Sequence, residues 1–167
     1  MRPTLFILCG YPFAGKSTLC RKIINHSDNV VHFCIDEFFE AHPELQDEEE
    51  RWDVVFQHGR DLSCAALKEG KHVLFDATNY LKKERAKLRR MAEGCGGEAT
   101  VIYVEIPMEI ARQRWMENRA TALRKDVTEA AWTEVTGDFE TPTMDEHVIV
   151  YRWNEDKDAW VQQHFQK

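Results

Sequence analysis

A nine-residue stretch near the amino terminus places the strongest constraint on what this chain can fold into. Residues 10–18 read Gly-Tyr-Pro-Phe-Ala-Gly-Lys-Ser-Thr, a complete G-x-x-x-x-G-K-S pattern. The unbroken apolar run Leu5–Cys9 precedes it, and Leu19, Ile23 and Ile24 follow at helical spacing. A short apolar run is typical of a strand buried on both faces. The sequence therefore predicts a strand, a loop and a helix in succession, the context in which this pattern binds phosphate.

The residue types of this loop suit a nucleoside triphosphate. Gly10 and Gly15 let the backbone wrap closely around an anion, because they lack a side chain. Backbone N–H groups and the positive end of the following helix then face the phosphates. Lys16 is expected to reach the β- and γ-phosphates, and the Ser17 hydroxyl to bind Mg²⁺. The expected nucleotide contacts are Gly10, Tyr11, Pro12, Phe13, Ala14, Gly15, Lys16, Ser17 and Thr18.

Length and composition indicate one globular domain that spans residues 1–167. The net charge of −7 argues against indiscriminate coating of nucleic acid. No apolar run approaches the length of a membrane span, so no membrane partner is expected. The cysteines are odd in number and form no C-x-x-C pair, which predicts packed, reduced thiols in a cytoplasmic protein. They are Cys9, Cys20, Cys34, Cys64 and Cys95.

Strand and helix patterns alternate along the rest of the chain. The expected strands are 5–9, 30–35, 72–75, 100–106 and 147–152, and the expected helices are 16–25, 48–68, 81–92, 108–118, 126–136 and 158–166. This alternation predicts a parallel sheet with helices on both faces. Asp126 and Glu129 fit a helix cap with its return partner. The acidic run 44–53 is expected to be a solvated surface rather than a metal site.

Two aspartates stand where expected strands end. Asp36 follows the second strand and Asp76 the third. Because ligands collect at the carboxyl ends of parallel strands, both should meet the phosphate loop in one crevice. Asp76 is expected to hold Mg²⁺ together with Ser17, the alternative being a turn-forming residue. Asp36 is expected to be the general base that takes a proton from an acceptor hydroxyl, the alternative being an aspartate bonded to its own turn.

Arginines near the following helices suggest a mobile cover for the site. Arg112, Arg114 and Arg119 lie on the helix after Pro107, which runs into an irregular segment. Such arginines can close on a transferred phosphoryl group, so a lid is expected over about 112–137, with ordinary surface arginine as the alternative. Helix 81–92 is strongly basic, either as a solvated face or as a nucleic-acid track; its cations are Lys82, Lys83, Arg85, Lys87, Arg89 and Arg90. Before it, Thr78 and Asn79 either cap the helix or contact a ligand.

Taken in order, these motifs resemble a known group of small P-loop kinases, the zeta-toxin-like and polynucleotide-kinase-like AAA-domain kinases. The resemblance rests on the phosphate loop, Cys34-Ile35-Asp36, residues 73–79 with Arg85, and the arginines after Pro107. It implies a three-layer fold like that of nucleoside monophosphate kinases, with a five-stranded parallel sheet in the order 2-3-1-4-5. It also implies ATP-dependent phosphorylation of a hydroxyl. The roles it implies are catalysis for Lys16, Asp36, Arg114 and Arg119, and Mg²⁺ binding for Ser17 and Asp76.

One position departs from the group and bears on the acceptor. Polynucleotide 5′-kinases of this group carry an arginine three residues after the base, where this chain has Phe39 beside Phe38. Two phenylalanines suit a flat or apolar acceptor, so the expected reaction is transfer of the γ-phosphoryl of ATP to a small-molecule hydroxyl. The alternatives are a polynucleotide 5′-hydroxyl kinase, with a nucleic-acid end as partner, and an ATP-binding regulatory or toxin-like module. A GTPase is disfavoured, because Ala-Thr-Asn follows Asp76 where D-x-x-G would be expected.

Overall fold

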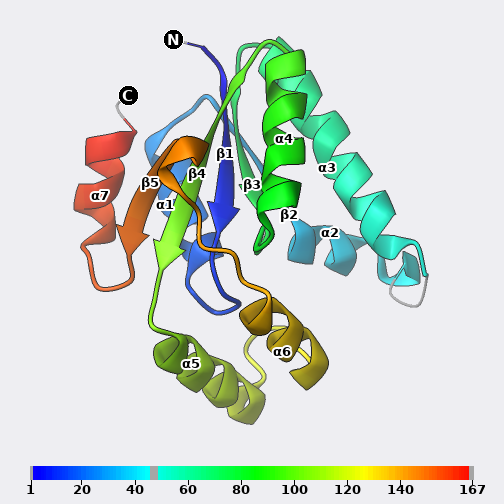
Figure 1. Ribbon diagram of the computed structural model, residues 1–167, viewed down its shortest axis with the longest axis vertical. Helices are drawn as coiled ribbons and strands as arrows, with labels where there is room; N and C mark the ends of the chain where they lie inside the picture. Colours follow the sequence, from blue (N-terminus) through cyan, green and yellow to red (C-terminus); the bar gives the residue numbers. More distant parts are fainter. Residues whose placement is uncertain (1, 46–48, 166–167) are drawn as a thin grey trace.

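The structure, a computed structural model, describes residues 2–45 and 49–165. Five parallel strands form one sheet in the order β2-β3-β1-β4-β5 (Figure 1), which confirms the expected topology. The strands are β1 Thr4–Cys9, β2 Val30–Cys34, β3 His72–Asp76, β4 Glu98–Glu105 and β5 Val148–Arg152. The α-helices are α1 Lys16–His26, α2 Ile35–Ala41, α3 Arg51–Lys68, α4 Lys82–Gly94, α5 Met108–Thr121, α6 Glu129–Gly137 and α7 Lys157–His164. The 3₁₀ turns are η1 Pro43–Leu45 and η2 Met144–Glu146.

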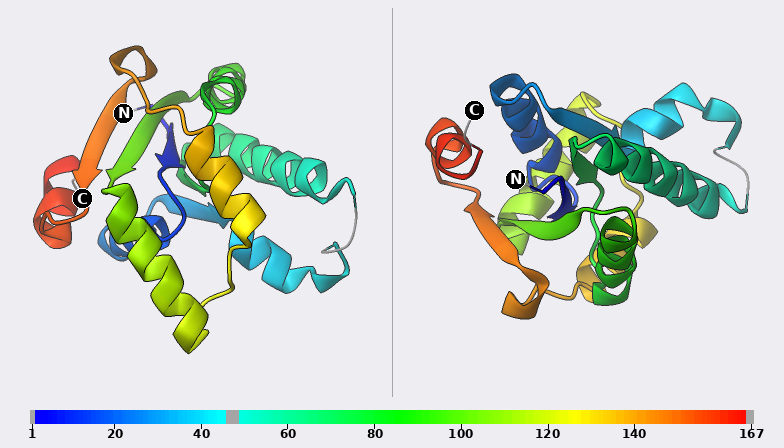
Figure 2. Two further views of the ribbon diagram at one scale, coloured as in Figure 1. Left: turned by 60° about the horizontal axis from the view of Figure 1, so that its bottom comes forward. Right: turned by 90° about the horizontal axis from the view of Figure 1, so that it is seen from above.

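Helices cover both faces of the sheet, as its apolar strands require. Helices α3 and α4 lie on one face, and α1 and α7 on the other (Figure 2). Alternate residues of β1 serve the two layers: Leu5 and Ile7 pack with α3 and α4, whereas Leu8 packs with α1. All three side chains are fully buried. Within the described residues, no helix is both long and apolar enough to cross a membrane.

The register of the sheet fixes where the functional loops meet. Strand β1 lies at the centre, with Ile7 opposite Phe75 of β3 and Cys9 opposite Tyr103 of β4. At the other side of β3, Asp76 is paired with Cys34 of β2. The loops after β1, β2 and β3 therefore leave the sheet at one edge. Helices α5 and α6 lie beyond that same edge (Figure 1).

Several element ends differ from the sequence-based expectations. Helix α2 begins at Ile35, so Asp36 lies in a helical first turn rather than at the end of a strand. The start expected for α3, Glu48, lies outside the described residues, as does Gln166 at the expected end of α7. The expected cap at Asp126 with Glu129 is wrong, because Thr128 caps α6 through its hydroxyl, which accepts from the Ala131 N–H at 3.2 Å.

The prediction that all cysteines are reduced is also wrong. Cys64 of α3 and Cys95, just after α4, form a disulfide across a Cα–Cα separation of 5.4 Å. Their separation of 31 residues in the sequence gave no signal of pairing, because only the packing of α3 against α4 brings them together. Cys9, Cys20 and Cys34 are free and buried, as expected.

The disulfide gives a stability prediction. Closing a loop between positions 31 residues apart should stabilise the fold by about 3–4 kcal/mol through chain entropy. We therefore expect a thiol reductant to lower the urea midpoint of the parent protein clearly. The double variant Cys64→Ser/Cys95→Ser should start at the lower midpoint and show no further change with reductant. Identical unfolding curves for the parent protein with and without reductant would contradict the pairing.

Candidate active site

The phosphate loop leaves β1 and enters α1 through two unusual backbone conformations. Gly15 has φ +100°, a region that favours glycine, and Phe13 is also left-handed at φ 62°. A Cβ added at Gly15 would meet nothing closer than Nη1 of Arg114 at 3.9 Å, so the backbone conformation rather than crowding calls for glycine. The loop thus ends at the first turn of α1, where free N–H groups can bind an anion.

Lys16 of this loop interacts electrostatically with Asp36 and Asp76. Its side chain is buried, and Nζ donates to the carbonyls of Gly10 at 3.1 Å and Tyr11 at 2.8 Å. Burial lowers the pKa of Lys16, whereas the negative charges of Asp76 and Asp36 act to raise it. Both carboxylates therefore lie within electrostatic reach of the same ammonium group. The end of β3 with Asp76, the first turn of α2 with Asp36 and the loop lysine therefore lie at the same edge of the sheet.

Asp76 lies at the end of β3 and is only 4% exposed. Its Oδ2 is 3.3 Å from Nε2 of His32, and the Ser17 side chain is close enough to the carboxylate to help lower the pKa of Asp76. Burial acts to raise the pKa of Asp76, but the hydrogen bonds from His32 and Ser17 and the charge of Lys16 outweigh it and hold the pKa below its ordinary value. The Ser17 and Asp76 oxygens, placed side by side, are the hard ligands that Mg²⁺ prefers, so this pair fits the expected metal.

The residues that follow Asp36 form an aromatic wall. Phe39 is buried and packs edge-on against Trp52 of α3, with ring centroids 5.3 Å apart. The ammonium of Lys125, from the segment between α5 and α6, lies 5.8 Å above the same ring. Asp36 itself is exposed. An acceptor that approaches Asp36 would therefore meet a ring and a lysine at the position where polynucleotide kinases of the resembled group have an arginine.

Thr78 and Asn79 join the end of β3 to the phosphate loop rather than capping α4. The N-cap of α4 is Leu81. The Thr78 carbonyl accepts from the Gly10 N–H at 3.1 Å, and Asn79 Nδ2 donates to the Leu8 carbonyl at 2.7 Å. Asn79 is buried and has φ 43°, a backbone region that asparagine tolerates better than most residues. These two residues therefore fix the spacing between Asp76 and the loop.

Arg85 supports this spacing and was not expected to be buried, because its helix reads as a basic surface. Its side chain is fully buried, with Nε 2.7 Å and Nη2 3.0 Å from the two carboxylate oxygens of Glu146. Its Nη1 donates to the Asn79 carbonyl at 2.8 Å. A planar guanidinium can make such bidentate bonds, whereas a lysine cannot. The pair thus ties α4 and η2 to the segment that holds Asp76.

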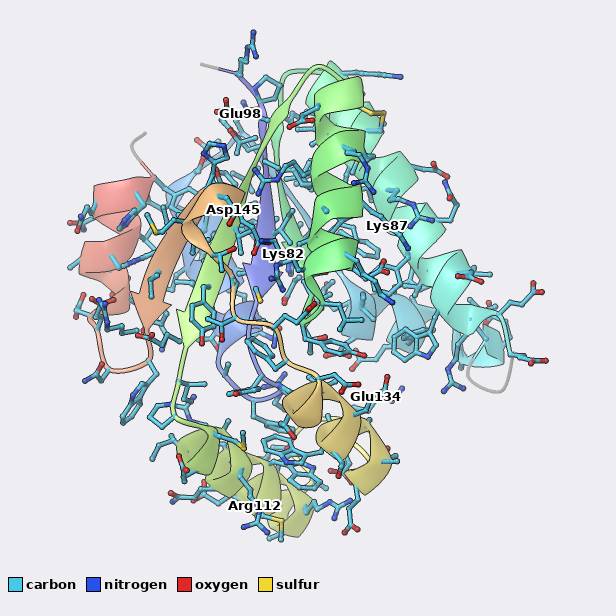
Figure 3. The ribbon with its side chains drawn as sticks, viewed as in Figure 1. Lys82, Lys87, Glu98, Arg112, Glu134 and Asp145 are labelled. Atoms are coloured by element: carbon cyan, nitrogen blue, oxygen red, sulfur yellow. A yellow bond between two sulfur atoms is a disulfide. The ribbon has the colours of Figure 1, made fainter. Side chains whose placement is uncertain are left out.

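Three other basic residues of α4 also contact neighbouring groups. Lys82 contacts Asp145 at 3.0 Å, and the two lie together beside η2 in Figure 3. Lys87 is 3.0 Å from Glu84 on its own helix, and Arg89 donates to the Glu146 carbonyl. Together with the burial of Arg85, these pairings remove much of the charge that a nucleic-acid backbone would need.

Two arginines approach the phosphate loop from the α5–α6 arm, which comprises α5, residues 122–128 and α6. Arg114 donates to the carbonyls of Phe13 at 3.2 Å and Ala14 at 3.4 Å. Arg124, which the sequence analysis did not select, lies 5.1 Å above the Phe13 ring, and its charge acts to lower the pKa of Lys16. Its position after a helical arginine run was the one available signal. Arg114 and Arg124 are therefore the two arm arginines for which contacts with the phosphate loop are described.

The other two arginines of α5 lie elsewhere. Arg119 is bound by carboxylates of the arm itself, with Nε 3.1 Å from Asp126 and Nη1 2.9 Å from Glu129. It would have to exchange these partners for a phosphate to act on one. Arg112 is exposed and lies on the side of α5 away from the sheet (Figure 3).

Internal contacts hold the arm together. Trp115 of α5 stacks on Trp132 of α6 at 4.6 Å, and its Nε1 donates to the Val127 carbonyl at 2.8 Å. Asn118 and Arg124 exchange two hydrogen bonds, of 3.0 and 2.9 Å. At the other side of the arm, Tyr80 donates to Glu134 at 2.9 Å and so links α6 to the segment after β3. The arm is thus a unit that is tied both to itself and to the rim of the site.

Comparison with known proteins adds a family to this geometry. Residues 5–142 match the family model described as AAA domain. The chain belongs to the AAA domain family. The matched range runs from β1 to the end of the α5–α6 arm, so it contains the phosphate loop, Asp36, Asp76 and the arm arginines. A search of curated proteins found no match.

Each of three solved structures with the same fold as this AAA domain is assigned as a kinase or is in complex with a nucleotide. A Chloroflexus aurantiacus protein assigned as a kinase aligns with a TM-score of 0.79 and 16% identity, over 99% of this chain and 98% of that one. Chaetomium thermophilum Kti12, in complex with ADP-AlF₃, aligns at 0.70 and 21%, over 95% and 94%. Mycobacterium tuberculosis APS kinase CysC, in complex with AMPPNP and APS, aligns at 0.66 and 16%, over 98% and 95%. Identities this low support the shared fold alone.

Proposed function

We propose that this protein is an ATP-dependent kinase that transfers the γ-phosphoryl group to a hydroxyl of a small-molecule acceptor. The observation that carries the proposal is the sheet register, which brings the ends of β1, β2 and β3, and so the loop of Lys16, Asp36 and Asp76, to one edge of the sheet. A phosphotransferase needs a base and a metal ligand beside the triphosphate. A module that only binds ATP would not need an exposed carboxylate at the position of Asp36.

Each residue then has a distinct role. The loop N–H groups and Lys16 bind and orient the triphosphate. Ser17 and Asp76 hold Mg²⁺, which neutralises charge on the phosphate oxygens when bound. Asp36 accepts the proton of the attacking hydroxyl, and Arg114 with Arg124 stabilises the negative charge that spreads over the transferred group. Arg119 remains a proposed lid residue, and in its present contacts it positions the segment that carries Arg124.

The acceptor side favours a small molecule over a nucleic-acid end. Phe39 is buried against Trp52, so its ring replaces a phosphate-binding arginine with an apolar wall. Arg85, Lys82 and Lys87 of α4 are each paired with a carboxylate, which reduces the positive charge that α4 could offer to a polynucleotide backbone. Lys125, whose ammonium lies over the Phe39 ring, can offer a hydrogen-bonding charge to an otherwise flat acceptor.

A transfer screen tests this proposal directly. ATP labelled at the γ-phosphate is offered with Mg²⁺ and panels of nucleosides, sugars, aminoglycosides and 5′-hydroxyl oligonucleotides. We expect label in a small-molecule class and none in the oligonucleotides. Label in oligonucleotides alone would replace the proposed acceptor with a polynucleotide end. If the label appears only in inorganic phosphate, water has been the acceptor, and a nucleotide-hydrolysing module would be favoured over a kinase.

The arm arginines give a second prediction about this reaction. Arg124→Ala should slow transfer roughly 10–100-fold, because it removes a charge-assisted bond worth about 1.5–3 kcal/mol. Arg112→Ala, on the outer side of the same arm, is the matched control and should leave the rate unchanged. Arg119→Ala should also slow transfer, through the loss of its bonds to Asp126 and Glu129. The rate constant of a single turnover checks all three, and equal rates for Arg124→Ala and Arg112→Ala would exclude Arg124 from the phosphate site.

A further inference from the structure

Three side chains that could together hold a metal ion include Asp76 of the candidate nucleotide site. Sγ of Cys20, a ring nitrogen of His32 and a carboxylate oxygen of Asp76 all lie within 4.8 Å of one another. They come from three elements, α1, β2 and β3. Cys20 is fully buried, and the side chains of His32 and Asp76 are only 14% and 3% exposed. This mixed set is unlike the exposed acidic clusters that are common on protein surfaces.

The three donors are already oriented toward one another. Nε2 of His32 is 3.3 Å from Asp76 Oδ2, and Sγ of Cys20 lies within 4.8 Å of both the ring nitrogen and the carboxylate oxygen. Ligands of a tetrahedral Zn²⁺ lie about 3.3–3.8 Å apart, given Zn–ligand bonds of about 2.0–2.3 Å. The donor atoms, at most 4.8 Å apart, therefore need to draw together by no more than about 1.5 Å to surround an ion of this size.

The chemistry of the donors selects the kind of ion. Thiolate and imidazole are soft or borderline ligands that favour Zn²⁺ and related transition metals, whereas Mg²⁺ prefers oxygen ligands alone. We propose that Cys20, His32 and Asp76 form a Zn²⁺ site, with the fourth position left to a water molecule. On binding, the Cys20 S–H bond breaks, a zinc–sulfur bond forms, and the proton leaves to solvent. His32 binds through neutral Nε2.

The site shares Asp76 with the proposed Mg²⁺ ligands, and this gives it a consequence for the nucleotide site. Asp76 turns Oδ2 toward His32, and its carboxylate also lies close to the Ser17 side chain. A Zn²⁺ ion on the His32 side would draw the carboxylate away from Ser17. Zn²⁺ should therefore weaken binding of ATP with Mg²⁺, whatever acceptor the protein uses. This consequence rests on the proposed nucleotide binding, whereas the site itself does not.

Metal titration in the absence of nucleotide tests the site. Co²⁺ is used first, because a cobalt–thiolate bond gives a charge-transfer absorption in the near ultraviolet, and Zn²⁺ is then titrated against a coloured chelator. We expect one Co²⁺ per chain with a thiolate band, displaced by Zn²⁺. Cys20→Ser should abolish the band, and Cys20→Ser and His32→Gln should each weaken Zn²⁺ binding more than about 100-fold. Cys34→Ser is the matched control, because Cys34 is a free, buried cysteine whose backbone lies opposite Asp76 in the neighbouring strand.

The outcomes separate cleanly. A band that persists in Cys20→Ser, or that is lost in Cys34→Ser instead, overturns the assignment, as does the absence of any Co²⁺ or Zn²⁺ binding by the folded parent protein. If Cys20→Ser does not fold, His32→Gln decides, and unchanged Zn²⁺ affinity in that variant overturns the site. A thermal-shift assay then asks whether Zn²⁺ reduces stabilisation by ATP with Mg²⁺ in the parent protein and not in Cys20→Ser. Failure of ATP to bind at all would count against the proposed kinase and leave the metal titrations as the test of this site.

Discussion

Replacing Arg85 with methionine is expected to lower the free energy of unfolding by about 3–5 kcal/mol. The substitution leaves Glu146 buried without the guanidinium that now binds both of its carboxylate oxygens. It also removes a donor from the Asn79 carbonyl. Urea unfolding at neutral pH measures the change. Lys87→Met is the matched control, since Lys87 lies on the same helix in an exposed pair and should change stability by about 0–1 kcal/mol.

The pH dependence identifies the cause of that loss. Burial acts to raise the pKa of Glu146, but the hydrogen bonds from Arg85 and the Thr143 N–H outweigh it and hold the pKa below its ordinary value. A depressed carboxyl pKa stabilises the fold above the unfolded pKa, about 4.3, and this contribution disappears as pH falls through the folded value. The gap between parent and Arg85→Met should therefore be full at neutral pH and shrink in acid. A gap that stays constant down to acid unfolding would mean that lost packing, rather than the ion pair, causes the effect.

Replacing Asp36 with asparagine is expected to slow phosphoryl transfer by about 10²- to 10⁴-fold. Asparagine keeps the shape of the side chain in the first turn of α2 but cannot accept a proton. ATP binding should change little, because the loop and Lys16 remain. Single-turnover rates together with thermal shifts by ATP separate the two effects.

The neighbouring carboxylate supplies the control for this prediction. Glu37 is also exposed and also lies in the first turn of α2. Glu37→Gln removes one charge from the same turn, as Asp36→Asn does. It should nevertheless transfer at the parent rate, because Glu37 is not the proposed base. If Asp36→Asn transfers at nearly the parent rate, or if Glu37→Gln is equally slow, then Asp36 is not the base.

Much of the fold followed from the sequence because its signals are local. The run Leu5–Cys9 is apolar throughout, as a strand covered on both faces must be, and the glycine loop defines what comes next. Alternation of strands and helices then leaves few topologies for a parallel sheet with right-handed crossovers. The family resemblance implied the strand order that the structure has. Element ends were less predictable. Thr128 rather than Asp126 caps α6, because Asp126 instead accepts from Trp115 and Arg119.

The positions of candidate site residues were predictable where they depend on neighbours in the sequence. They were not predictable where they depend on contacts between residues far apart in the sequence. Asp76 and Lys16 are fixed by their immediate neighbours, so the sequence places them. The burial of Arg85 depends on Glu146, 61 residues later, and no local pattern distinguishes it from the surface cations of its helix. The disulfide has the same character, since Cys64 meets Cys95 only when α3 packs on α4. The position of Arg124 depends on how the arm folds back over Phe13.

The stacked tryptophans of the α5–α6 arm have a consequence for the timing of the proposed reaction. Because Trp115 and Trp132 hold the two helices together, Arg114 on one helix and Arg124 beyond it cannot approach the triphosphate independently. We expect both arginines to move toward and away from the triphosphate together, so that conformations with only one of them in place are rare. Such all-or-none closure would protect bound ATP from wasteful attack by water until an acceptor is in position.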